Sequence, residues 1–121
     1  MTQARILFVD DDDALREVVR GQLEVAGYEC AEARDGEEAM TKLGMEKYDL
    51  VLLDINMPNK SGIDVLKFMQ EKSMKSRIIM LTGRVGFSIA TESLKLGADE
   101  YITKPFSLDY LLGAIQRVLA K

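Results

Sequence analysis

Residues 50–53 constrain the fold of this chain more than any other stretch. All four are apolar, and a run without polar alternation predicts a strand that is buried on both faces, as in the middle of a parallel sheet. The run ends at Asp54, and the turn-forming residues Asn56, Pro58 and Gly62 follow it. We therefore expect the chain to leave the sheet here and to expose Asp54 at the carboxyl end of the strand. From this stretch alone, Asp54 is either a turn residue or a reactive carboxylate.

The same pattern returns along the whole chain. Residues 6–9 and 78–81 are also unbroken apolar runs, and weaker strand-like runs cover residues 28–33 and 100–103. Outside these runs the apolar residues recur every three or four positions, which predicts helices. Five strands that alternate with five helices favour a doubly wound α/β fold, in which a parallel sheet is covered on both faces. We predict a single domain over residues 1–121.

Polar residues and glycines mark the expected helix ends. Asp13 is a candidate N-cap for the first helix, and Gly27 is a candidate stop for it. A fourth helix is expected over residues 87–96, with Gly97 as its stop. Ser107 has the position of an N-cap for the last helix.

Composition excludes several classes of function. With 47% apolar and 30% charged residues and no membrane-spanning or signal segment, the chain is predicted to be a soluble cytoplasmic protein. The absence of histidine excludes catalytic triads and histidine-containing zinc sites. The single cysteine, Cys30, excludes thiolate cages and is expected to be a small buried residue. A net charge of −4 argues against direct binding of nucleic acid.

Polar side chains follow four of the five predicted strands. Asp10 and Asp11 come after the first strand, Asp54 after the third, Thr82 after the fourth and Lys104 after the fifth. Ligands of open parallel sheets bind outside the carboxyl ends of the strands. We therefore expect three carboxylates, a hydroxyl and an ammonium to meet at one edge.

Such a group of side chains indicates a cation and a phosphoryl group. Carboxylates held close together repel one another unless a cation or protons intervene. Oxygen ligands alone favour a hard ion, and so few of them favour Mg²⁺, which Mn²⁺ is able to replace. Phosphoryl transfer depends on positioning and on neutralising the phosphoryl oxygens, so that Asp54 becomes a candidate phosphoryl acceptor.

Four motifs at these strand ends resemble those of a known family. They are Val9-Asp10-Asp11, Leu53-Asp54-Ile55-Asn56-Met57-Pro58, Leu81-Thr82-Gly83 and Ala98-Asp99-Glu100-Tyr101-Ile102-Thr103-Lys104-Pro105-Phe106. Together they resemble the receiver domain of two-component response regulators, over the whole chain and in family order. The resemblance implies a chemotaxis-regulator-like sheet with strand order 2-1-3-4-5.

The resemblance also implies how the site works. Asp54 would take a phosphoryl group from a phosphohistidine of a sensor histidine kinase or phosphotransfer protein. Asp10, Asp11 and the backbone carbonyl of Asn56 would hold Mg²⁺ together with Asp54. The chain would then be a regulatory domain that catalyses only its own phosphorylation and slow dephosphorylation.

Further residues would convey the signal. Thr82 and Lys104 would each bind a phosphoryl oxygen, and a cis peptide bond between Lys104 and Pro105 would direct the ammonium towards the site. Tyr101 matches the aromatic switch position and would move inward when Thr82 is drawn to the phosphate. The surface of the fourth helix, fifth strand and fifth helix would then change for a downstream protein, an output domain or a second copy of the chain.

Three other interpretations stay open at this point. A phosphatase of the haloacid dehalogenase type needs a second aspartate where this chain has Asn56. A flavin-binding protein of the same sheet class needs a phosphate-binding loop where residues 10–13 are carboxylates. A receiver that acts as a scaffold without phosphorylation would be expected to lack a site residue. Because the chain ends just after the last helix, we expect a stand-alone regulator, the alternative being a receiver cut from a longer protein.

Overall fold

The computed structural model describes residues 3–57, 59–83 and 92–121. Strands and helices alternate in the order β1 (Arg5–Val9), α1 (Asp13–Val25), β2 (Glu29–Ala33), α2 (Gly36–Met45), β3 (Leu50–Asp54), α3 (Gly62–Glu71), β4 (Arg77–Thr82), β5 (Glu100–Thr103) and α5 (Leu108–Leu119). None of the helices in these ranges has the length and apolar character needed to cross a bilayer.

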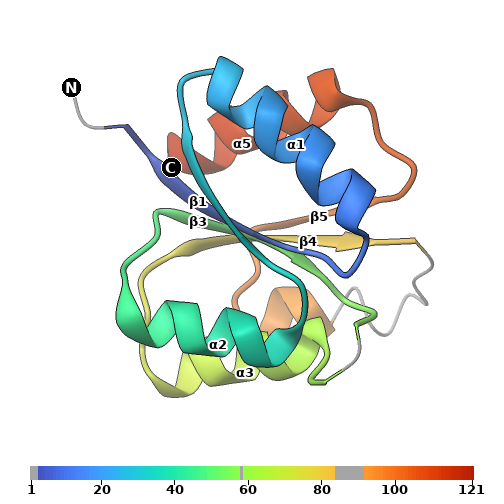
Figure 1. Cartoon of the computed structure of the whole chain (residues 1–121). Coiled ribbons are helices and arrows are strands. Elements are labelled where there is room, and N and C mark those ends of the chain that lie inside the picture. Colours follow the sequence, from blue (N-terminus) through green and yellow to red (C-terminus); the bar gives the residue numbers. More distant parts are fainter. Residues whose placement is uncertain (1–2, 58, 84–91) are drawn as a thin grey trace.

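The five strands form one parallel sheet in the order β2-β1-β3-β4-β5. Figure 1 shows α1 and α5 on one face of the sheet and α2 and α3 on the other. The strand order reverses between β1 and β3, which is where sheets of this kind bind ligands. The predicted doubly wound fold and its strand order are therefore confirmed.

The apolar runs are continuous because both faces of the sheet are covered. Leu7 and Val9 pack into the core with α2 and α3, whereas Ile6 and Phe8 pack into the core with α1 and α5. All four side chains are fully buried, as are residues 50–53. A strand with one face in water would show polar alternation, so the interpretation of these runs as central strands is correct.

The helix ends agree with the sequence in all but one described case. Gly27 and Gly97 have φ values of 97° and 104°, in the left-handed region that suits the residue after a helix. Ser107 accepts a hydrogen bond from the backbone N–H of Tyr110, as an N-cap does. Of the predicted helix over residues 87–96, residues 87–91 lie outside the described residues, and residues 92–95 are helical.

The predicted N-cap at Asp13 is wrong. The cap is Asp12, which has an extended backbone and accepts a hydrogen bond of 3.1 Å from the N–H of Leu15. Asp13 is the first residue of α1, and its carboxylate pairs with Arg16 one turn along the helix. In a run of four aspartates each has the same capping propensity, and the backbone conformation decides which of them caps the helix.

Candidate functional site

Three carboxylates meet at the carboxyl edge of the sheet. Asp10 and Asp11 follow β1, and Asp54 is the last residue of β3; an oxygen of each lies within 4.8 Å of the others. Asp11 is exposed, but the exposed fraction is 0% for Asp10 and 4% for Asp54. The expectation of an exposed Asp54 is therefore wrong: its side chain is enclosed because β1 and β3 are neighbours and their ends carry the other members of the cluster.

The ammonium of Lys104 enters the same cluster. Its Nζ lies 2.7 Å from Oδ2 of Asp10 and 3.7 Å from Oδ1 of Asp54. The backbone N–H of Lys104 donates to the carbonyl of Thr82 at 2.6 Å, so the residue continues the pairing of β5 with β4. The Lys104–Pro105 peptide bond is cis.

The pKa values reflect this crowding. Burial, followed by the charge of Asp10, raises the pKa of Asp54 from 3.8 to about 6, although Lys104 acts in the opposite direction. Burial lowers the pKa of Lys104, but the hydrogen bond and charge of Asp10, together with the charges of Asp54 and Asp11, outweigh it, so the pKa lies above its ordinary value. The site therefore has an excess of negative charge that one lysine does not neutralise.

The Thr82 side chain is fully buried at the end of β4. Within the described ranges, its Oγ1 is a buried side-chain atom without a hydrogen-bond partner. Thr82 directly follows Leu81, which is paired in the sheet with Asp54. Because an unpartnered buried hydroxyl is costly, it commonly indicates a ligand or a functional role.

A family model matches most of the chain. Residues 6–116 match the family model of the response regulator receiver domain. The chain belongs to this family. It is thus a regulatory domain of two-component signal transduction.

Two of the curated relatives of this chain are named transcriptional regulatory proteins. This chain is 40% identical over 112 residues to the transcriptional regulatory protein DltR of Streptococcus agalactiae, and the match covers 93% of this chain and 50% of DltR. It is 37% identical over 117 residues to the alkaline phosphatase synthesis transcriptional regulatory protein PhoP of Bacillus subtilis, covering 97% of this chain and 49% of PhoP. The chain spans about half the length of these curated relatives.

Solved structures match the receiver over nearly its full length. A CheY-like receiver domain protein from Methanospirillum hungatei has a TM-score of 0.95 at 34% identity, covering 98% of this chain and 95% of that one. TrrA from Thermotoga maritima, crystallised with Mg²⁺ and BeF, has a TM-score of 0.86 at 38% identity, covering 96% of this chain and 99% of that one.

The loop that follows Asp54 in the receiver is held close to the sheet. Ile55 donates to the carbonyl of Leu81 at 3.0 Å, and Gly62 donates to the carbonyl of Ile55 at 2.9 Å. A Cβ on Gly62 would lie 2.2 Å from the backbone oxygen of Asp54, so only glycine fits there. Asn56 lies in this loop with an exposed side chain, and its backbone hydrogen bond lowers the pKa of Asp54. Pro58 lies outside the described residues.

Tyr101, the predicted switch residue, lies outside the cluster, and Arg16 contacts the cluster. Tyr101 lies in β5 with 41% of its surface exposed, on the outside of the receiver. Arg16, which the sequence analysis did not single out, donates to the backbone carbonyl of Asp10 at 2.6 Å. The only signal in the sequence was its spacing of three residues from Asp13 on a helix, which is common on helix surfaces.

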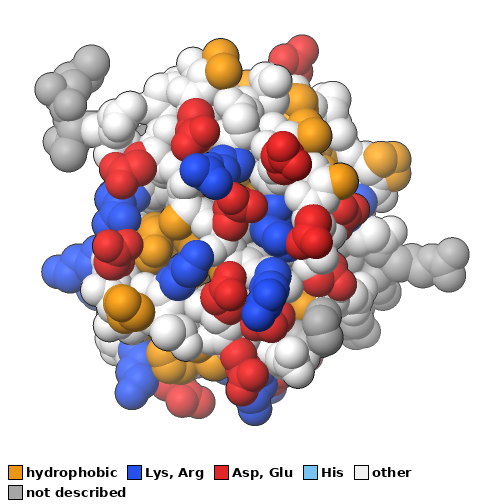
Figure 2. Space-filling model, in the orientation of Figure 1, with side chains coloured by type: hydrophobic (Ala, Val, Ile, Leu, Met, Phe, Trp, Pro, Cys, Tyr) orange, Lys and Arg blue, Asp and Glu red, His pale blue; other side chains and the backbone are white. Residues whose placement is uncertain are grey.

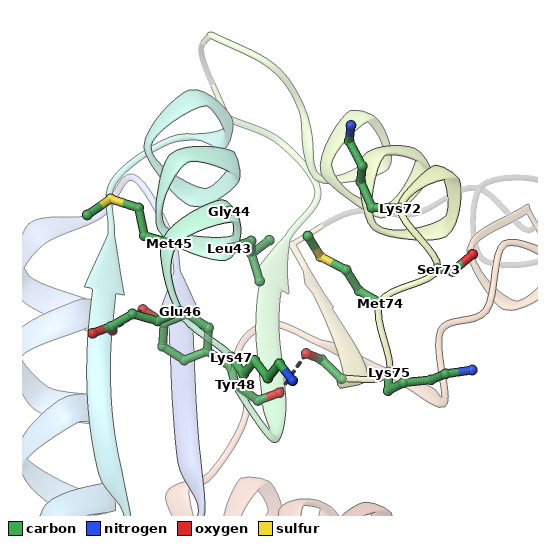
Figure 3. A pocket seen from close by; sticks show the side chains of 11 residues that line it. Leu43, Gly44, Met45, Glu46, Lys47, Tyr48, Lys72, Ser73, Met74 and Lys75 are labelled. Carbon is green, nitrogen blue, oxygen red and sulfur yellow. Dashed lines mark hydrogen bonds between the residues drawn. The ribbon is translucent and has the colours of Figure 1, made fainter.

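A cavity of about 530 Å³ lies elsewhere, where α2 and α3 end and β3 and β4 begin. Figure 3 shows it between apolar side chains, among them Leu43 and Met74, and the lysines Lys47, Lys72 and Lys75. It is at the opposite edge of the sheet from Asp54 and is lined by none of the predicted site residues. The carboxylate cluster, and not this cavity, is therefore the candidate functional site.

The carboxylate cluster fits a hard divalent cation. It offers only oxygen ligands, two of its three members are buried, and its excess negative charge matches the charge of such an ion.

Proposed function

We propose that the receiver takes a phosphoryl group onto Asp54 from a phosphohistidine of a partner kinase or phosphotransfer protein. The main support is the position of Asp54, which is buried in a cluster of three carboxylates with the Lys104 ammonium 3.7 Å away. In the proposed reaction an oxygen of Asp54 attacks phosphorus. The phosphorus–nitrogen bond of the donor breaks, and the imidazole nitrogen keeps the electron pair of that bond.

The proposal gives the other carboxylates the task of holding Mg²⁺. Asp10 and Asp11, with Asp54 and the backbone carbonyl of Asn56, are the proposed ligands. When bound, Mg²⁺ would neutralise charge on the phosphoryl oxygens and on the crowded carboxylates. The oxygen-only donor set supports this ion, and Mn²⁺, with the same preference for oxygen, is expected to replace it.

Thr82 and Lys104 are the proposed ligands of the phosphoryl group itself. The unpartnered hydroxyl of Thr82 would donate a hydrogen bond to one phosphoryl oxygen. Lys104 would exchange part of its contact with Asp10 for an ion pair with another oxygen. Both groups would stabilise the charge that phosphoryl transfer concentrates at the strand ends.

The output is proposed to follow from Thr82 and Tyr101. When Thr82 turns towards the phosphoryl group, the half-exposed ring of Tyr101 would move inward. This movement would change the surface formed by β5, α5 and the helix that ends before Gly97. That surface would contact a downstream protein, an output domain or a second receiver in the cytoplasm. The transcriptional regulators among the relatives, twice as long as this chain, support an output domain.

Intact mass spectrometry tests the proposal. Wild-type receiver incubated with Mg²⁺ and acetyl phosphate is expected to gain the mass of one phosphoryl group. The gain should be absent with EDTA and in Asp54→Ala, and present in Asp109→Ala, which removes an exposed carboxylate on α5. A wild type without the gain, or an Asp54→Ala receiver that keeps it, would contradict the proposal.

A further inference from the structure

We propose that Arg16 is a positioning residue of the cation site, which fixes the backbone of the Asp10–Asp11 segment through the carbonyl of Asp10. The inference rests on the proposed function, because it concerns how the same site is prepared for Mg²⁺. Arg16 is the fourth residue of α1, and its side chain is 13% exposed.

Three different groups hold the guanidinium of Arg16. Its Nη1 donates to the backbone carbonyl of Asp10 at 2.6 Å, and its Nε donates to Oε1 of Glu32 at 3.2 Å. Its Nη2 donates to the carboxylate of Asp13. Because each nitrogen of the planar fork has its own partner, both the position and the plane of the guanidinium are fixed.

The carbonyl of Asp10 belongs to the peptide bond that joins Asp10 to Asp11. A hydrogen bond to this carbonyl therefore sets the direction in which the backbone delivers the exposed Asp11 side chain to the cluster. Three other hydrogen bonds hold the segment: the N–H of Asp10 donates to the carbonyl of Ala33 at 3.1 Å, its Oδ1 accepts from the N–H of Asp12 at 2.9 Å, and its Oδ2 accepts from Lys104 at 2.7 Å. Arg16 adds a hydrogen bond to the peptide group that joins Asp10 to Asp11.

Arg16 also acts on the run of acids itself. Residues 10–13 are four consecutive aspartates, and the pairing with Arg16 keeps the Asp13 carboxylate on the surface of α1, where it is 88% exposed. Figure 2 shows that acidic and basic side chains are interspersed on the face of the molecule that includes α1 and α2. Arg16 thus holds one acid of the run away from Asp10 and Asp11, the two that belong to the cluster.

Charge and geometry have opposite effects at this position. The positive charge of Arg16 disfavours a nearby cation, whereas its hydrogen bond to Asp10 prepares the ligands for one. Arg16→Lys separates the two effects, because lysine keeps the charge but lacks the fork that reaches three partners. A merely electrostatic role predicts wild-type affinity for this variant, and a positioning role predicts weaker binding.

Arg20 provides the matched control. It lies one turn further along α1, donates to the same Glu32 at 2.8 Å and pairs with Glu24 at 3.4 Å. In the described part of the chain, the side-chain hydrogen bonds and ion pairs of Arg20 are with these two glutamates and not with Asp10 or Asp13. Arg16→Lys and Arg20→Lys are therefore the same substitution on the same helix and share one partner.

The experiment is a titration of Mg²⁺ into wild type, Arg16→Lys and Arg20→Lys by calorimetry, with the Asp11 amide resonance followed by NMR. Arg16→Lys is expected to raise the dissociation constant of Mg²⁺ about tenfold, the lower end for residues that orient metal ligands, and Arg20→Lys to change it by less than about twofold. The Asp11 amide should shift before Mg²⁺ is added in Arg16→Lys and stay in place in Arg20→Lys.

Equal Mg²⁺ affinities in wild type and Arg16→Lys, or equal losses in both variants, would overturn the role of Arg16. If Arg16→Lys fails to fold, Arg16→Gln and Arg20→Gln are compared instead; both lose one charge, so weaker binding in Arg16→Gln alone supports the role, and equal binding overturns it. A wild type that does not bind Mg²⁺ contradicts the proposed function itself.

Discussion

Lys104 lies closer to Asp10 than to the proposed phosphoryl acceptor: its Nζ is 2.7 Å from Oδ2 of Asp10 and 3.7 Å from Oδ1 of Asp54. The ammonium is thus an internal counter-ion of a carboxylate that is proposed to bind Mg²⁺. Lysine and Mg²⁺ would compete for Asp10, and Mg²⁺ binding would release Lys104 towards the phosphoryl group.

Removal of Lys104 is therefore expected to strengthen Mg²⁺ binding. A unit charge a few ångströms from a divalent cation is worth at least about 1 kcal/mol, so Lys104→Met should lower the dissociation constant roughly fivefold or more. Calorimetry at about pH 8, where Asp54 is ionised, measures the change. Lys67→Met on the exposed side of α3 is the control and should leave the affinity unchanged. Weaker binding in Lys104→Met would refute the competition.

The raised pKa of Asp54 predicts how stability depends on pH when Mg²⁺ is removed. The pKa is about 6 in the folded receiver and 3.8 as the ordinary value, so between these limits the folded state holds more protons than the unfolded chain. The free energy of unfolding should therefore fall as the pH rises through this window. Above the window, the destabilising contribution of ionised Asp54 should have reached its full size.

Asp54→Asn cannot ionise and is expected to avoid this cost. In EDTA at about pH 8 it should be more stable than wild type by about 1–3 kcal/mol, and the difference should shrink towards zero below about pH 4. Urea denaturation across the pH range measures both free energies of unfolding. A difference that is independent of pH would show that the titration of Asp54 is not its cause.

The close approach of Gly62 to Asp54 predicts a strict requirement for glycine. Since a Cβ would lie 2.2 Å from a backbone oxygen, Gly62→Ala should push the acceptor strand and the loop apart and cost about 1–3 kcal/mol or more. Gly21→Ala is the control, because a Cβ at this position in α1 would meet no described atom within 4 Å apart from its chain neighbours and the backbone of its own helix. That variant should gain about 0.5–1 kcal/mol from helix propensity. Thermal unfolding compares the two, and equal effects would contradict the clash.

The N-cap of α1 is tested by alanine at two neighbouring acids. Asp12→Ala removes the oxygen that caps the N–H of Leu15 and should cost about 1 kcal/mol. Asp13→Ala removes an ion pair with Arg16 in which the aspartate side chain is 88% exposed, and should cost about 0.5 kcal/mol or less. Urea denaturation measures the free energy of unfolding of both variants, and Asp12→Ala should be the less stable of the two. If Asp13→Ala is the less stable, Asp13 and not Asp12 is the N-cap.

The sheet was predictable from the sequence because each central strand is an unbroken apolar run with a polar residue at its end. The same rule brought Asp10, Asp54, Thr82 and Lys104 to one edge, since parallel strands end together. The burial of Asp54 was not predictable, because it depends on how the ends of β1 and β3 lie side by side.

Contacts with backbone groups were also not predictable from sequence patterns. One partner of Arg16 is the backbone carbonyl of Asp10, a group that every residue has and that no sequence pattern marks. Another partner, Glu32, is 16 residues away in the sequence. The unpartnered hydroxyl of Thr82 is likewise defined by what surrounds it in three dimensions. The residue types at the strand ends predict which groups meet. The burial and hydrogen bonds of these groups can be determined only from the three-dimensional structure.

The central claim is that the carboxylate of Asp54 forms the acyl phosphate, and locating the modified residue tests it most directly. The receiver is phosphorylated with Mg²⁺ and acetyl phosphate and reduced with borohydride, which converts an aspartyl phosphate to homoserine, and its peptides are then sequenced by mass spectrometry. We expect homoserine at position 54 and unmodified aspartate at positions 10 and 11. Homoserine at any other position, or none in phosphorylated receiver, would contradict the account.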